Sequence, residues 1–319
     1  MKNIALIGTG RHGSRYGQHI FRDLAGVQLA GISRQSSDLG HEQANNWQTT
    51  FFDNWRSLIA EPNVDGVITV TPPALNLEVA RECARLSKPL LIEKPLARNV
   101  KEAEEILRIM DAAGVSLTVA QTLRYNPVIQ ALRAALPGMG QLYSFYANQR
   151  LEPSTLTWHD DRNAAGAGVL FHTAVHVFDA LKTITGLRVK RVMAQGRQIH
   201  ANVLEDLVLA SVEMENGVLG TVDVSKVGNA RTGRFEFVCQ GGQIHGDQIH
   251  AGLEIITGNT VSERRSFVQE PTILHLLQDW RDFLEGRRPN PITGEEGLSA
   301  VRVCEACLVS MKEQRWVEV

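Results

Sequence analysis

A pair of histidines in the segment GVLFHTAVHVFD, residues 168–179, has residue types and spacing that could do chemistry. His172 and His176 are four residues apart in a pattern that otherwise predicts a helix. Because four residues make about one helical turn, both imidazoles should project from the same face. Imidazoles placed in this way can bind a metal ion, transfer protons, or form hydrogen bonds at the edge of a packed helix.

A metal site would need a further ligand, which His159, Asp160 or Asp161 could supply. However, HTAVH lacks the interior glutamate of the zinc motif H-E-x-x-H, so we expect no metal. Two hydrogen-bonded histidines without a catalytic role are a second alternative. General acid–base catalysis is the favoured interpretation, because an imidazole can take up and release a proton near neutral pH.

The helical periodicity separates the two histidines from an apolar surface. His172, His176 and Thr183 fall on one row, and Asp179 lies three residues beyond His176. Seven apolar residues fall on neighbouring rows: Leu170, Phe171, Ala174, Val175, Val177, Phe178 and Leu181. The sequence therefore predicts a helix whose apolar rows pack while its polar row faces a cleft.

A glycine-rich turn forms a second candidate site near the start of the chain. The segment GTGRHG follows an apolar run and precedes a helical stretch that reaches about Leu24. In this G-x-G-x-x-G pattern the first glycine permits a tight turn, the second lets a pyrophosphate approach, and the third lets helix and strand pack closely. The helix start then offers N–H groups to the anion. Five residues of the turn are expected to contact a dinucleotide: Gly8, Gly10, Arg11, His12 and Gly13.

The residue about twenty positions after the glycines usually selects between the two nicotinamide cofactors. The second strand ends in GISRQSSD, with Ser33 and Arg34 at this place and no carboxylate before Asp38. A hydroxyl and a guanidinium suit a 2′-phosphate, which a carboxylate would repel. We therefore expect NAD(P) with a preference for NADP; the alternative is that Arg34 is an ordinary solvated loop residue.

A lysine follows the strand that is expected near the centre of the first sheet. In LLIEKPLARNV, Pro95 ends the strand and restricts Lys94 to extended backbone, directly after Glu93. Because ligands of open α/β sheets bind outside the carboxyl ends of the strands, the ammonium of Lys94 should reach the cofactor cleft. The alternative, which position alone leaves open, is an ordinary solvated surface lysine.

The elements that must position these residues divide the chain into two parts. Continuous apolar strands separated by amphipathic helices predict a parallel sheet covered on both faces over residues 1–121. The strands are expected at 4–7, 27–33, 64–70, 88–93 and 115–120. After a helix from Pro127 to about Leu136, alternating patterns predict a mainly antiparallel sheet, with a hairpin at Asn216-Gly217 and further strands at 234–240 and 252–257. Two helices, 272–285 and 295–312, close the chain.

Composition narrows the classes of function. A length of 319 residues predicts two domains, and a net charge of −2 gives no reason to expect nucleic acid or a membrane surface as partner. No apolar run approaches the roughly 18 residues of a membrane span, and the N-terminus is not of signal-peptide type. Four scattered cysteines fit a reducing cytoplasm, where we expect the protein. Cys304 and Cys307 form a C-x-x-C that is better explained by burial than by redox or zinc chemistry.

Together these segments resemble the glucose–fructose oxidoreductase / inositol dehydrogenase family of NAD(P)-dependent oxidoreductases. The matching pieces occur in the family's order and span nearly the whole chain: GTGRHG, VTPPALNLEVA, KPLLIEKPLA, RYNP, GAGVLFHTAVHVFD and TGEEGLSAVRVCEACLVS. The resemblance implies a Rossmann domain over 1–121 and an α/β domain for substrate binding and oligomer contacts over 122–319. It further implies that the final helix can pack back on the first domain, and that the protein is a homo-oligomer, a dimer or tetramer.

The resemblance also assigns roles to individual residues. Lys94 would sit where nicotinamide and substrate meet, Thr71 and Pro72 would border the cofactor, and Glu93 would help to hold it. Asn76 stands where relatives commonly have His, so its cofactor contact is expected to be altered. On the substrate side, the resemblance and the loop before the histidine helix suggest four residues: Arg124, Tyr125, Trp158 and Arg162.

The histidine helix matches the family's catalytic helix with one departure. His176 aligns with the catalytic histidine, whereas His172 stands where relatives keep an aspartate and Ala174 replaces a glycine. Losing that negative charge predicts either weak activity or a changed substrate preference, for an anionic or less hydroxylated molecule. We expect an oxidoreductase acting on a sugar, cyclitol or related compound, with Lys94 polarising the reacting oxygen, His176 as acid–base, and His172 beside the substrate. The alternative is a non-catalytic sensor of the same fold.

Overall fold

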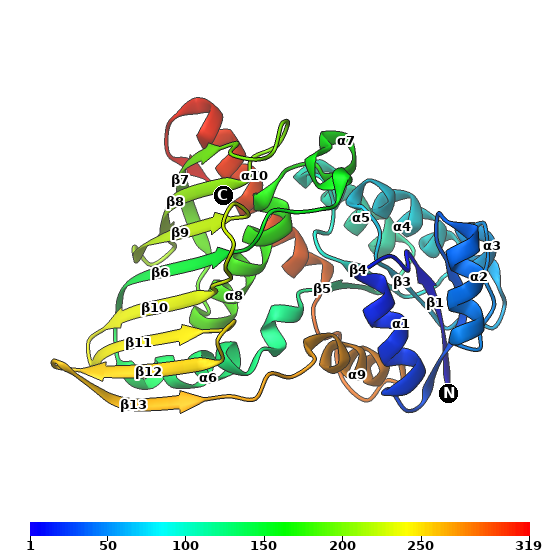
Figure 1. The fold of residues 1–319 in the computed structure, drawn as a ribbon, viewed down its shortest axis with the longest axis horizontal. Helices are drawn as coiled ribbons and strands as arrows, with labels where there is room; N and C mark the ends of the chain where they lie inside the picture. Colours follow the sequence, from blue (N-terminus) through cyan, green and yellow to red (C-terminus); the bar gives the residue numbers. More distant parts are fainter. The chain divides into compact units, whose positions relative to one another are not determined.

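The structure is a computed structural model that describes all residues, Met1–Val319, and the chain forms two compact units (Figure 1). Unit 1 comprises Met1–Thr122 together with Pro271–Leu298, and unit 2 comprises Leu123–Glu270 together with Ser299–Val319. The sequence analysis assigns everything after residue 121 to the second domain. The segment Pro271–Leu298 differs from that expectation, because its apolar side chains pack on the first sheet.

Unit 1 is built on a five-stranded sheet in which every pair of neighbours is parallel. In spatial order the strands are β2 (Val27–Ser33), β1 (Lys2–Ile7), β3 (Gly66–Thr69), β4 (Leu90–Glu93) and β5 (Leu117–Ala120). Every residue of β3, β4 and β5 is buried, as expected for a parallel sheet covered on both faces. The expected Rossmann-type α/β fold of the first domain is confirmed.

Six helices flank this sheet. They are α1 (Gly13–Arg22), α2 (Ser37–Asn46), α3 (Trp55–Ala60), α4 (Asn76–Arg85), α5 (Val100–Ala112) and α9 (Thr272–Leu284). The crossovers from β3 to β4 and from β4 to β5 run opposite to that from β1 to β2, so right-handed connections place α4 and α5 on the face away from α1. Helix α9 contacts α1 and completes the other face.

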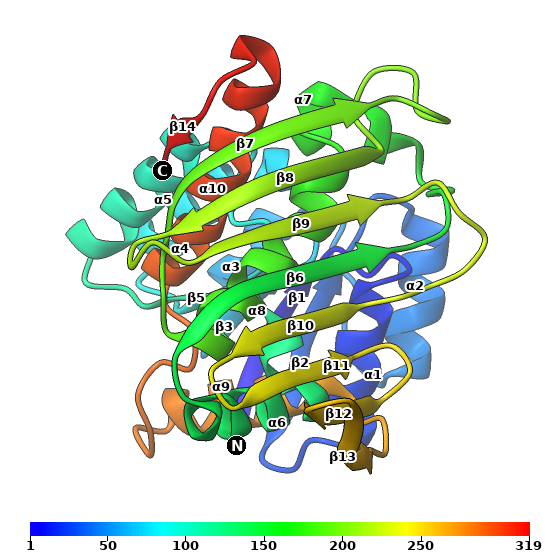
Figure 2. The same ribbon diagram turned by 90° about the vertical axis from the view of Figure 1, so that its left-hand side faces the viewer.

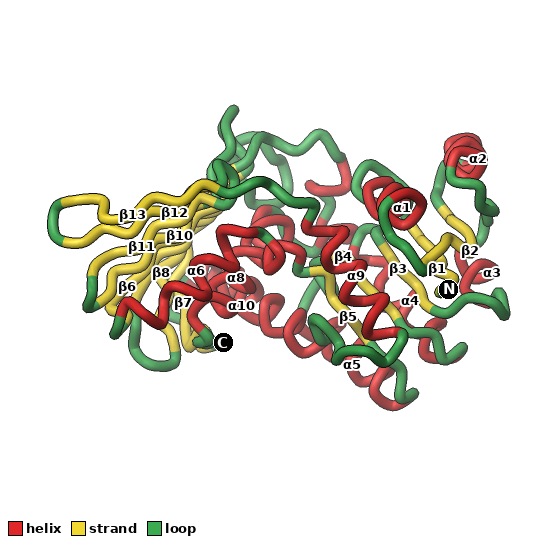
Figure 3. The backbone as a smooth tube through the Cα atoms, turned by 90° about the horizontal axis from the view of Figure 1, so that it is seen from below, coloured by secondary structure: helices red, strands yellow, loops and turns green.

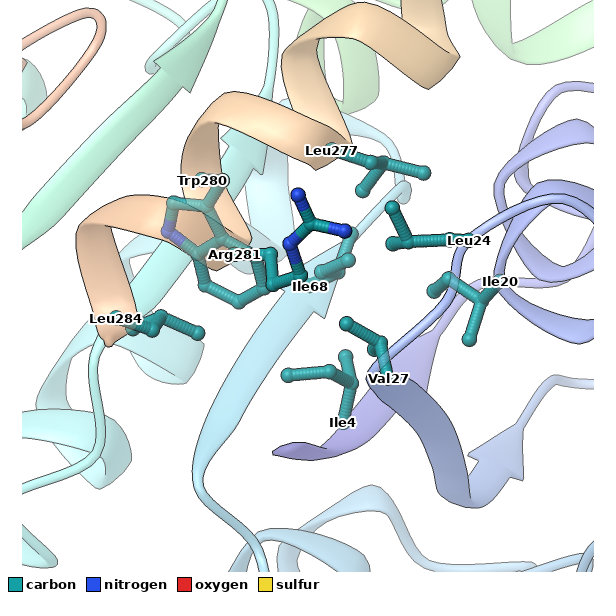
Figure 4. A pocket seen from close by; sticks show the side chains of 9 residues that line it. All are labelled: Ile4, Ile20, Leu24, Val27, Ile68, Leu277, Trp280, Arg281 and Leu284. Carbon is teal, nitrogen blue, oxygen red and sulfur yellow. The ribbon is translucent and has the colours of Figure 1, made fainter. Parts of the chain in front are cut away.

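Helix α9 joins unit 1 through an apolar seam against α1, β1 and β3 (Figure 4). Nine side chains line the seam: Ile4, Ile20, Leu24, Val27, Ile68, Leu277, Trp280, Arg281 and Leu284. The indole of Trp280 covers Gly66 so closely that a Cβ at that glycine would lie 2.9 Å from the ring. The first turn of α10 (Gly294–Glu313) belongs to the same unit, and its Gly294 and Gly297 pack against Leu117 and Val119 of β5.

Unit 2 is built on a nine-stranded sheet that is antiparallel except where β6 and β9 pair in parallel. In spatial order its strands are β13 (Thr260–Ser266), β12 (Gly252–Thr257), β11 (Gly242–Asp247), β10 (Arg234–Cys239), β6 (Leu142–Arg150), β9 (Leu219–Ser225), β8 (Leu207–Met214), β7 (Val189–Arg197) and β14 (Val317–Glu318). The predicted hairpin is confirmed: β8 pairs antiparallel with β9, and Gly217 adopts a φ of +86° in the turn.

Helices cover only one face of this second sheet. Helices α6 (Pro127–Ala135) and α8 (Val175–Thr185) contact its strands, and they lie with α10 on the same side of the strands (Figure 3). The opposite face carries no helix of unit 2 (Figure 2). The sheet is therefore open on that face.

The histidine helix differs from the expected continuous α-helix. After the short helix α7 (Arg162–Ala165), residues Leu170–Ala174 form a π-helical turn, and α8 begins only at Val175. The N–H of Val175 donates to the carbonyl of Leu170, five residues back, which is the pattern of a π-turn. The thiol of Cys304 donates to the same carbonyl at 3.4 Å.

The stretch Arg162–Thr185 has the length and composition of a membrane-crossing helix, although the sequence analysis expects no such span. In the structure 83% of its most apolar window is buried inside the fold, as in the core helix of a folded domain. The four cysteines are all free thiols and buried, and the burial of Cys304 and Cys307 agrees with the prediction for these two. Burial raises the pKa of Cys307 to about 12, so this thiol is a poor nucleophile.

Candidate active site

The glycine turn between β1 and α1 is close-packed at two of its glycines, where no side chain fits, and open at the third, where a ligand can approach. A Cβ on Gly13 would lie 1.9 Å from the carbonyl oxygen of Gly8, so helix and strand can pack here only with glycine. Gly8 itself has a φ of +88°, and a Cβ there would meet the carbonyl of Val70 at 2.4 Å. Gly10, by contrast, is exposed, and a Cβ at this position would have no atom within 4 Å. This arrangement fits the pyrophosphate of a dinucleotide approaching over Gly10 at the start of α1.

Arg34 lies against this turn. Its Nη1 donates to the carbonyl of Thr9 at 3.2 Å and to Oε1 of Gln43 at 2.9 Å. Gln43 also donates through Nε2 to Ser14 Oγ at 2.9 Å, so hydrogen bonds connect α2 to the turn. Ser33 is buried, and its carbonyl accepts from the N–H of Gly8. The guanidinium expected at the 2′-position of the cofactor ribose is thus held in place by neighbours.

Glu93, the last residue of β4, is held by two residues of the first turn and helix. The hydroxyl of Tyr16 donates to Glu93 Oε2 at 2.5 Å, and Nε2 of His12 lies 3.4 Å from the same oxygen. Burial by itself would raise the pKa of the Glu93 carboxyl. The charge and hydrogen bond of His12, together with Lys94 and Tyr16, outweigh burial and hold the pKa of Glu93 below its ordinary value. Glu93 is therefore ionised, and its charge lies next to Lys94.

Lys94 is partly buried at the carboxyl end of β4, where the sequence analysis expects it. Burial lowers the pKa of its ammonium, and the neighbouring Glu93 charge partly offsets that effect. Asn76 is fully buried and donates from Nδ2 to the carbonyls of Pro95 at 3.2 Å and Leu96 at 3.1 Å. It therefore braces the segment that follows the lysine.

The other expected cofactor residues surround the turn. Thr71 lies two residues beyond the end of β3 with its methyl group against Gly8, and its hydroxyl is 3.0 Å from that of Thr69. Pro72 begins the short turn that leads into α4. Arg11 is exposed. All of these belong to unit 1.

His172 belongs to an aromatic stack in unit 2. Its imidazole is only 8% exposed and stacks on His159 with ring centroids 3.9 Å apart and an interplanar angle of 23°. Trp158 meets both rings edge-on, at 4.2 Å from His159 and 5.3 Å from His172. The structure therefore brings Trp158 and His172 into contact, whereas Arg162 is exposed.

His176 lies in the first turn of α8 and is half-buried. Asp179, three residues further along, is buried and forms a bidentate ion pair with Arg124, with N–O distances of 2.6 and 2.8 Å. This pair fixes the turn that carries His176 to the start of the second unit. The guanidinium of Arg124, which the sequence analysis expects to contact substrate, forms this ion pair with Asp179. Tyr125 follows Arg124 in the same short turn.

A buried glutamate anchors the start of the same helix. The carbonyl of Glu205 accepts from the N–H of Val169 at 2.8 Å, and its Oε1 accepts from Leu170 at 3.2 Å. Desolvation raises the pKa of Glu205 despite these hydrogen bonds. Gly168 is required at this contact, because a Cβ would lie 1.9 Å from the Glu205 carbonyl. The structure contains no group of three or more His, Cys, Asp or Glu side chains arranged to hold a metal ion.

Three residues of the site were not singled out from the sequence. Tyr16 and Gln43 lie on helices where a tyrosine or glutamine carries no positional signal, and Lys226 follows β9 without any motif. Only the fold shows that Tyr16 reaches Glu93, that Gln43 reaches Arg34, and that Lys226 reaches His159.

Comparison with protein families finds matches in both parts of the chain. Residues 2–121 match the GFO/IDH/MocA family described as an oxidoreductase family with an NAD-binding Rossmann fold. Residues 139–245 match the C-terminal domain of the same family.

Individual relatives match over nearly the whole chain. Myo-inositol 2-dehydrogenase of Thermotoga maritima is 23% identical over 99% of this chain and 98% of its own. The 4-carboxy-2-hydroxymuconate-6-semialdehyde dehydrogenase of Sphingobium sp. is 26% identical over 98% of this chain and 99% of its own. Among solved structures, levoglucosan dehydrogenase in complex with NADH and levoglucosan superimposes with a TM-score of 0.88 at 20% identity, covering 100% of this chain and 99% of that one.

Proposed function

Because the chain belongs to the GFO/IDH/MocA family of NAD-binding oxidoreductases, we propose that it transfers hydride between NAD(P) and a sugar, cyclitol or related hydroxy or keto compound. The observation that carries this proposal is the partly buried Lys94 at the end of β4, beside an ionised Glu93 that Tyr16 and His12 hold in place. A strand-end ammonium of this kind is placed where an open α/β sheet binds its ligands.

The nicotinamide, when bound, supplies the carbon that accepts or gives up hydride. The turn Gly8–Gly13 would hold its pyrophosphate, and Thr71 and Pro72 would border it. Lys94 hydrogen-bonds the reacting oxygen of the substrate and stabilises the charge that develops on it. His176 takes the hydroxyl proton during oxidation and returns it during reduction.

The proposed cofactor is NAD(P) with a preference for NADP. In support, hydrogen bonds to Thr9 and Gln43 hold Arg34 beside the turn, and neither Ser33 at the end of β2 nor Arg34 directly after it is acidic. A carboxylate at this place would bind the ribose hydroxyl of NAD and repel a 2′-phosphate.

The proposed substrate class is inferred from the names of similar proteins. Their names describe a cyclitol, an anhydrosugar and a carboxylated semialdehyde, which share an oxidisable or reducible carbon–oxygen group on a small polar skeleton. Unit 2 would bind this molecule through the helix that carries His172 and His176, with Trp158 offering an aromatic surface.

We further propose a homo-oligomer, a dimer or tetramer, associated through the open face of the second sheet. Tyr143, Leu209, Leu219 and Val238 of its strands are each more than a third exposed. Exposed apolar residues on an uncovered sheet are typical of a protein–protein contact.

The test is a panel of sugars, cyclitols and keto-sugars incubated with oxidised or reduced NAD and NADP while nicotinamide absorbance is followed. We expect turnover of at least one member, and loss of that turnover in Lys94→Ala with cofactor affinity retained. Lys101→Ala, an exposed lysine on α5, is the matched control and should keep full activity. Cofactor binding without turnover of any panel member would instead indicate a sensor of the same fold.

A further inference from the structure

We propose that Gln121 binds the carboxamide of the nicotinamide ring, its side-chain oxygen accepting a hydrogen bond from the amide N–H₂ group of the cofactor. This inference rests on the proposed function and adds a cofactor contact to it. It comes from a buried glutamine oxygen that the protein leaves without a partner, at the edge of the sheet where an open α/β fold binds its ligands.

Gln121 directly follows β5, and the register of the first sheet places it at the strand end next to that of Lys94. In this register Glu93 of β4 is the partner of Ala120 of β5, so the two strands end level with each other. Lys94 and Gln121 are the next residues of the two chains. The glutamine therefore stands at a carboxyl strand end, adjoining that of the proposed catalytic lysine.

The side-chain oxygen of Gln121 is an acceptor without a donor. The residue is 1% exposed, and its Oε1 atom has no hydrogen-bond partner. Its backbone N–H, by contrast, donates to the carbonyl of Val119 at 2.9 Å. Because a buried polar atom that lacks a hydrogen bond destabilises the folded protein, its presence indicates a partner that the chain itself does not supply.

Other polar side chains at the same edge of the sheet have partners within unit 1. The carboxylate of Glu93 accepts from the hydroxyl of Tyr16, and the hydroxyls of Thr69 and Thr71 lie 3.0 Å apart. Gln121 differs from these residues in that its acceptor is both buried and unpaired. The missing hydrogen bond is therefore a property of this position and not of the whole edge.

Strand β5 is also held firmly on its outer side. Asn290 donates from Nδ2 to the carbonyl of Leu117 at 2.8 Å and accepts from the hydroxyl of Thr118 at 2.9 Å. The N–H of Val119 donates to the carbonyl of Ile292 at 3.1 Å. The strand that leads into Gln121 is thus paired along its edge, so a loosely held segment does not explain the unpaired oxygen.

The chemistry and the place of this acceptor select the ligand group. An acceptor needs a donor, and the nicotinamide amide offers two N–H donors without a net charge. The ribose phosphate of the cofactor would lie toward Arg34, after β2, and its pyrophosphate at the turn after β1. In the sheet order β4 and β5 lie on the opposite side of β1 from β2, so the nicotinamide end would lie toward Gln121. A ring bound there by its amide would have Lys94 beside it.

The experiment compares two cofactors that differ only in this amide. Calorimetry without substrate measures the affinities for NADP, or for NAD if it binds more tightly, and for its 3-acetylpyridine analogue, in which a methyl group replaces the N–H₂ group. We expect the wild type to bind the natural cofactor about five-fold or more tightly, the factor that one hydrogen bond supplies. In Gln121→Met, which keeps the side-chain size but removes the acceptor, the two affinities should become equal.

Thermal unfolding of the cofactor-free protein adds a readout that a purely structural glutamine would not give. Gln121→Met removes an unpaired buried acceptor, so the Tm of the free variant should rise while its affinity for the natural cofactor falls. Gln28→Met is the matched control, because Gln28 is an exposed glutamine at the amino end of β2 in the same sheet. It should change neither the Tm nor the ratio of the two affinities.

The outcomes separate this inference from the proposed function. Equal affinities of the wild type for the two cofactors, or a preference that survives in Gln121→Met, would overturn the inference. A lower Tm of the free variant with unchanged affinities would also overturn it and make Gln121 a structural residue. A preference that depends on Gln121, in a protein that turns over no substrate, would refute hydride transfer but not the contact. Binding of neither dinucleotide would refute both.

Discussion

The hydroxyl of Tyr16, on α1, donates a 2.5 Å hydrogen bond to the buried carboxylate of Glu93, at the end of β4. The two residues are 77 positions apart in the chain, and His12 of the glycine turn contacts the same carboxylate oxygen. Through this contact the turn that would hold the cofactor phosphates is tied to the charge beside Lys94. The cofactor turn and the proposed catalytic lysine therefore form one connected arrangement within unit 1.

Tyr16→Phe removes only the donor of that hydrogen bond and leaves the ring in its packed position. A hydrogen bond to a charged buried group contributes about 1.5–3 kcal/mol, so the free energy of unfolding should fall by about that amount. Urea unfolding at neutral pH measures the loss. Tyr143→Phe, on an exposed side chain, should change stability by no more than about 0.5 kcal/mol, and an equal loss in both variants would contradict the role of the contact.

Glu93 also makes stability depend on pH. Its folded pKa lies below the unfolded value of about 4.3, so its contribution is fully present above that value. The contribution is lost as pH falls from about 4.3 through the lowered folded pKa, because the unfolded state takes up the proton first. In Glu93→Gln the acid-induced loss of stability in this range should be smaller than in the wild type. Identical acid unfolding profiles would show that Glu93 is not linked to folding in this way.

The alkaline limit of activity should follow Lys94. Burial lowers the pKa of the ammonium from an ordinary value of about 10.4, so activity that needs the charged form should fall at a lower pH than an exposed lysine would give. The Glu93 charge opposes this shift. Glu93→Gln should therefore move the alkaline limb of kcat/KM to still lower pH. A limb that stays in place, or that moves upward, would contradict the proposed link between the two residues.

Two glycines of the turn should respond to alanine in opposite ways. Gly13→Ala would place a Cβ 1.9 Å from a backbone oxygen, so the variant should be destabilised by several kcal/mol or fail to fold. Gly10→Ala meets no atom within 4 Å, so its unfolding should be close to that of the wild type while cofactor affinity drops. Thermal unfolding and cofactor titration of both variants distinguish the structural glycine from the binding one. Unchanged cofactor affinity in Gly10→Ala would place the pyrophosphate elsewhere.

The cofactor preference depends on Arg34. Arg34→Ala should weaken NADP binding by about ten-fold or more, because a charge-assisted contact to the 2′-phosphate is worth about 1.5–3 kcal/mol, and it should leave NAD binding nearly unchanged. Fluorescence titration with both reduced cofactors measures the two affinities, with Arg22→Ala as an exposed control on α1. An equal effect on both cofactors would mean that Arg34 only holds the turn to Gln43.

The parts of the fold that follow from local pattern are predictable from the sequence. Residues 27–33 form a strand with the expected limits, and the hairpin at Asn216-Gly217 forms because a left-handed turn residue joins two alternating segments. The strand Leu142–Arg150 at the centre of the second sheet was not predicted. It alternates only partly, since Ala147 and Asn148 are adjacent and both buried.

Long-range contacts set the remaining features of the site. The apolar pattern of α9 shows that the helix buries one face but not that this face packs on Gly66 and the first sheet. Likewise, the π-turn at Leu170–Ala174 accompanies contacts from Glu205 and Cys304, residues far away in sequence. The stacking of His172 on His159 and the approach of Lys226 depend on the same loops. The residue types in the sequence indicate the chemistry of the site, whereas the partners that these residues contact are visible only in the folded structure.

The most direct test of the central claim is the rate of cofactor reduction by His176→Asn on the best substrate of the panel, measured beside cofactor affinity. Asparagine keeps a similar size and hydrogen-bonding capacity but cannot exchange a proton. We predict a loss of about 10²- to 10⁴-fold in kcat, the range for removing a general acid–base, with cofactor affinity unchanged. A variant that reduces the cofactor at the wild-type rate would contradict proton transfer by His176.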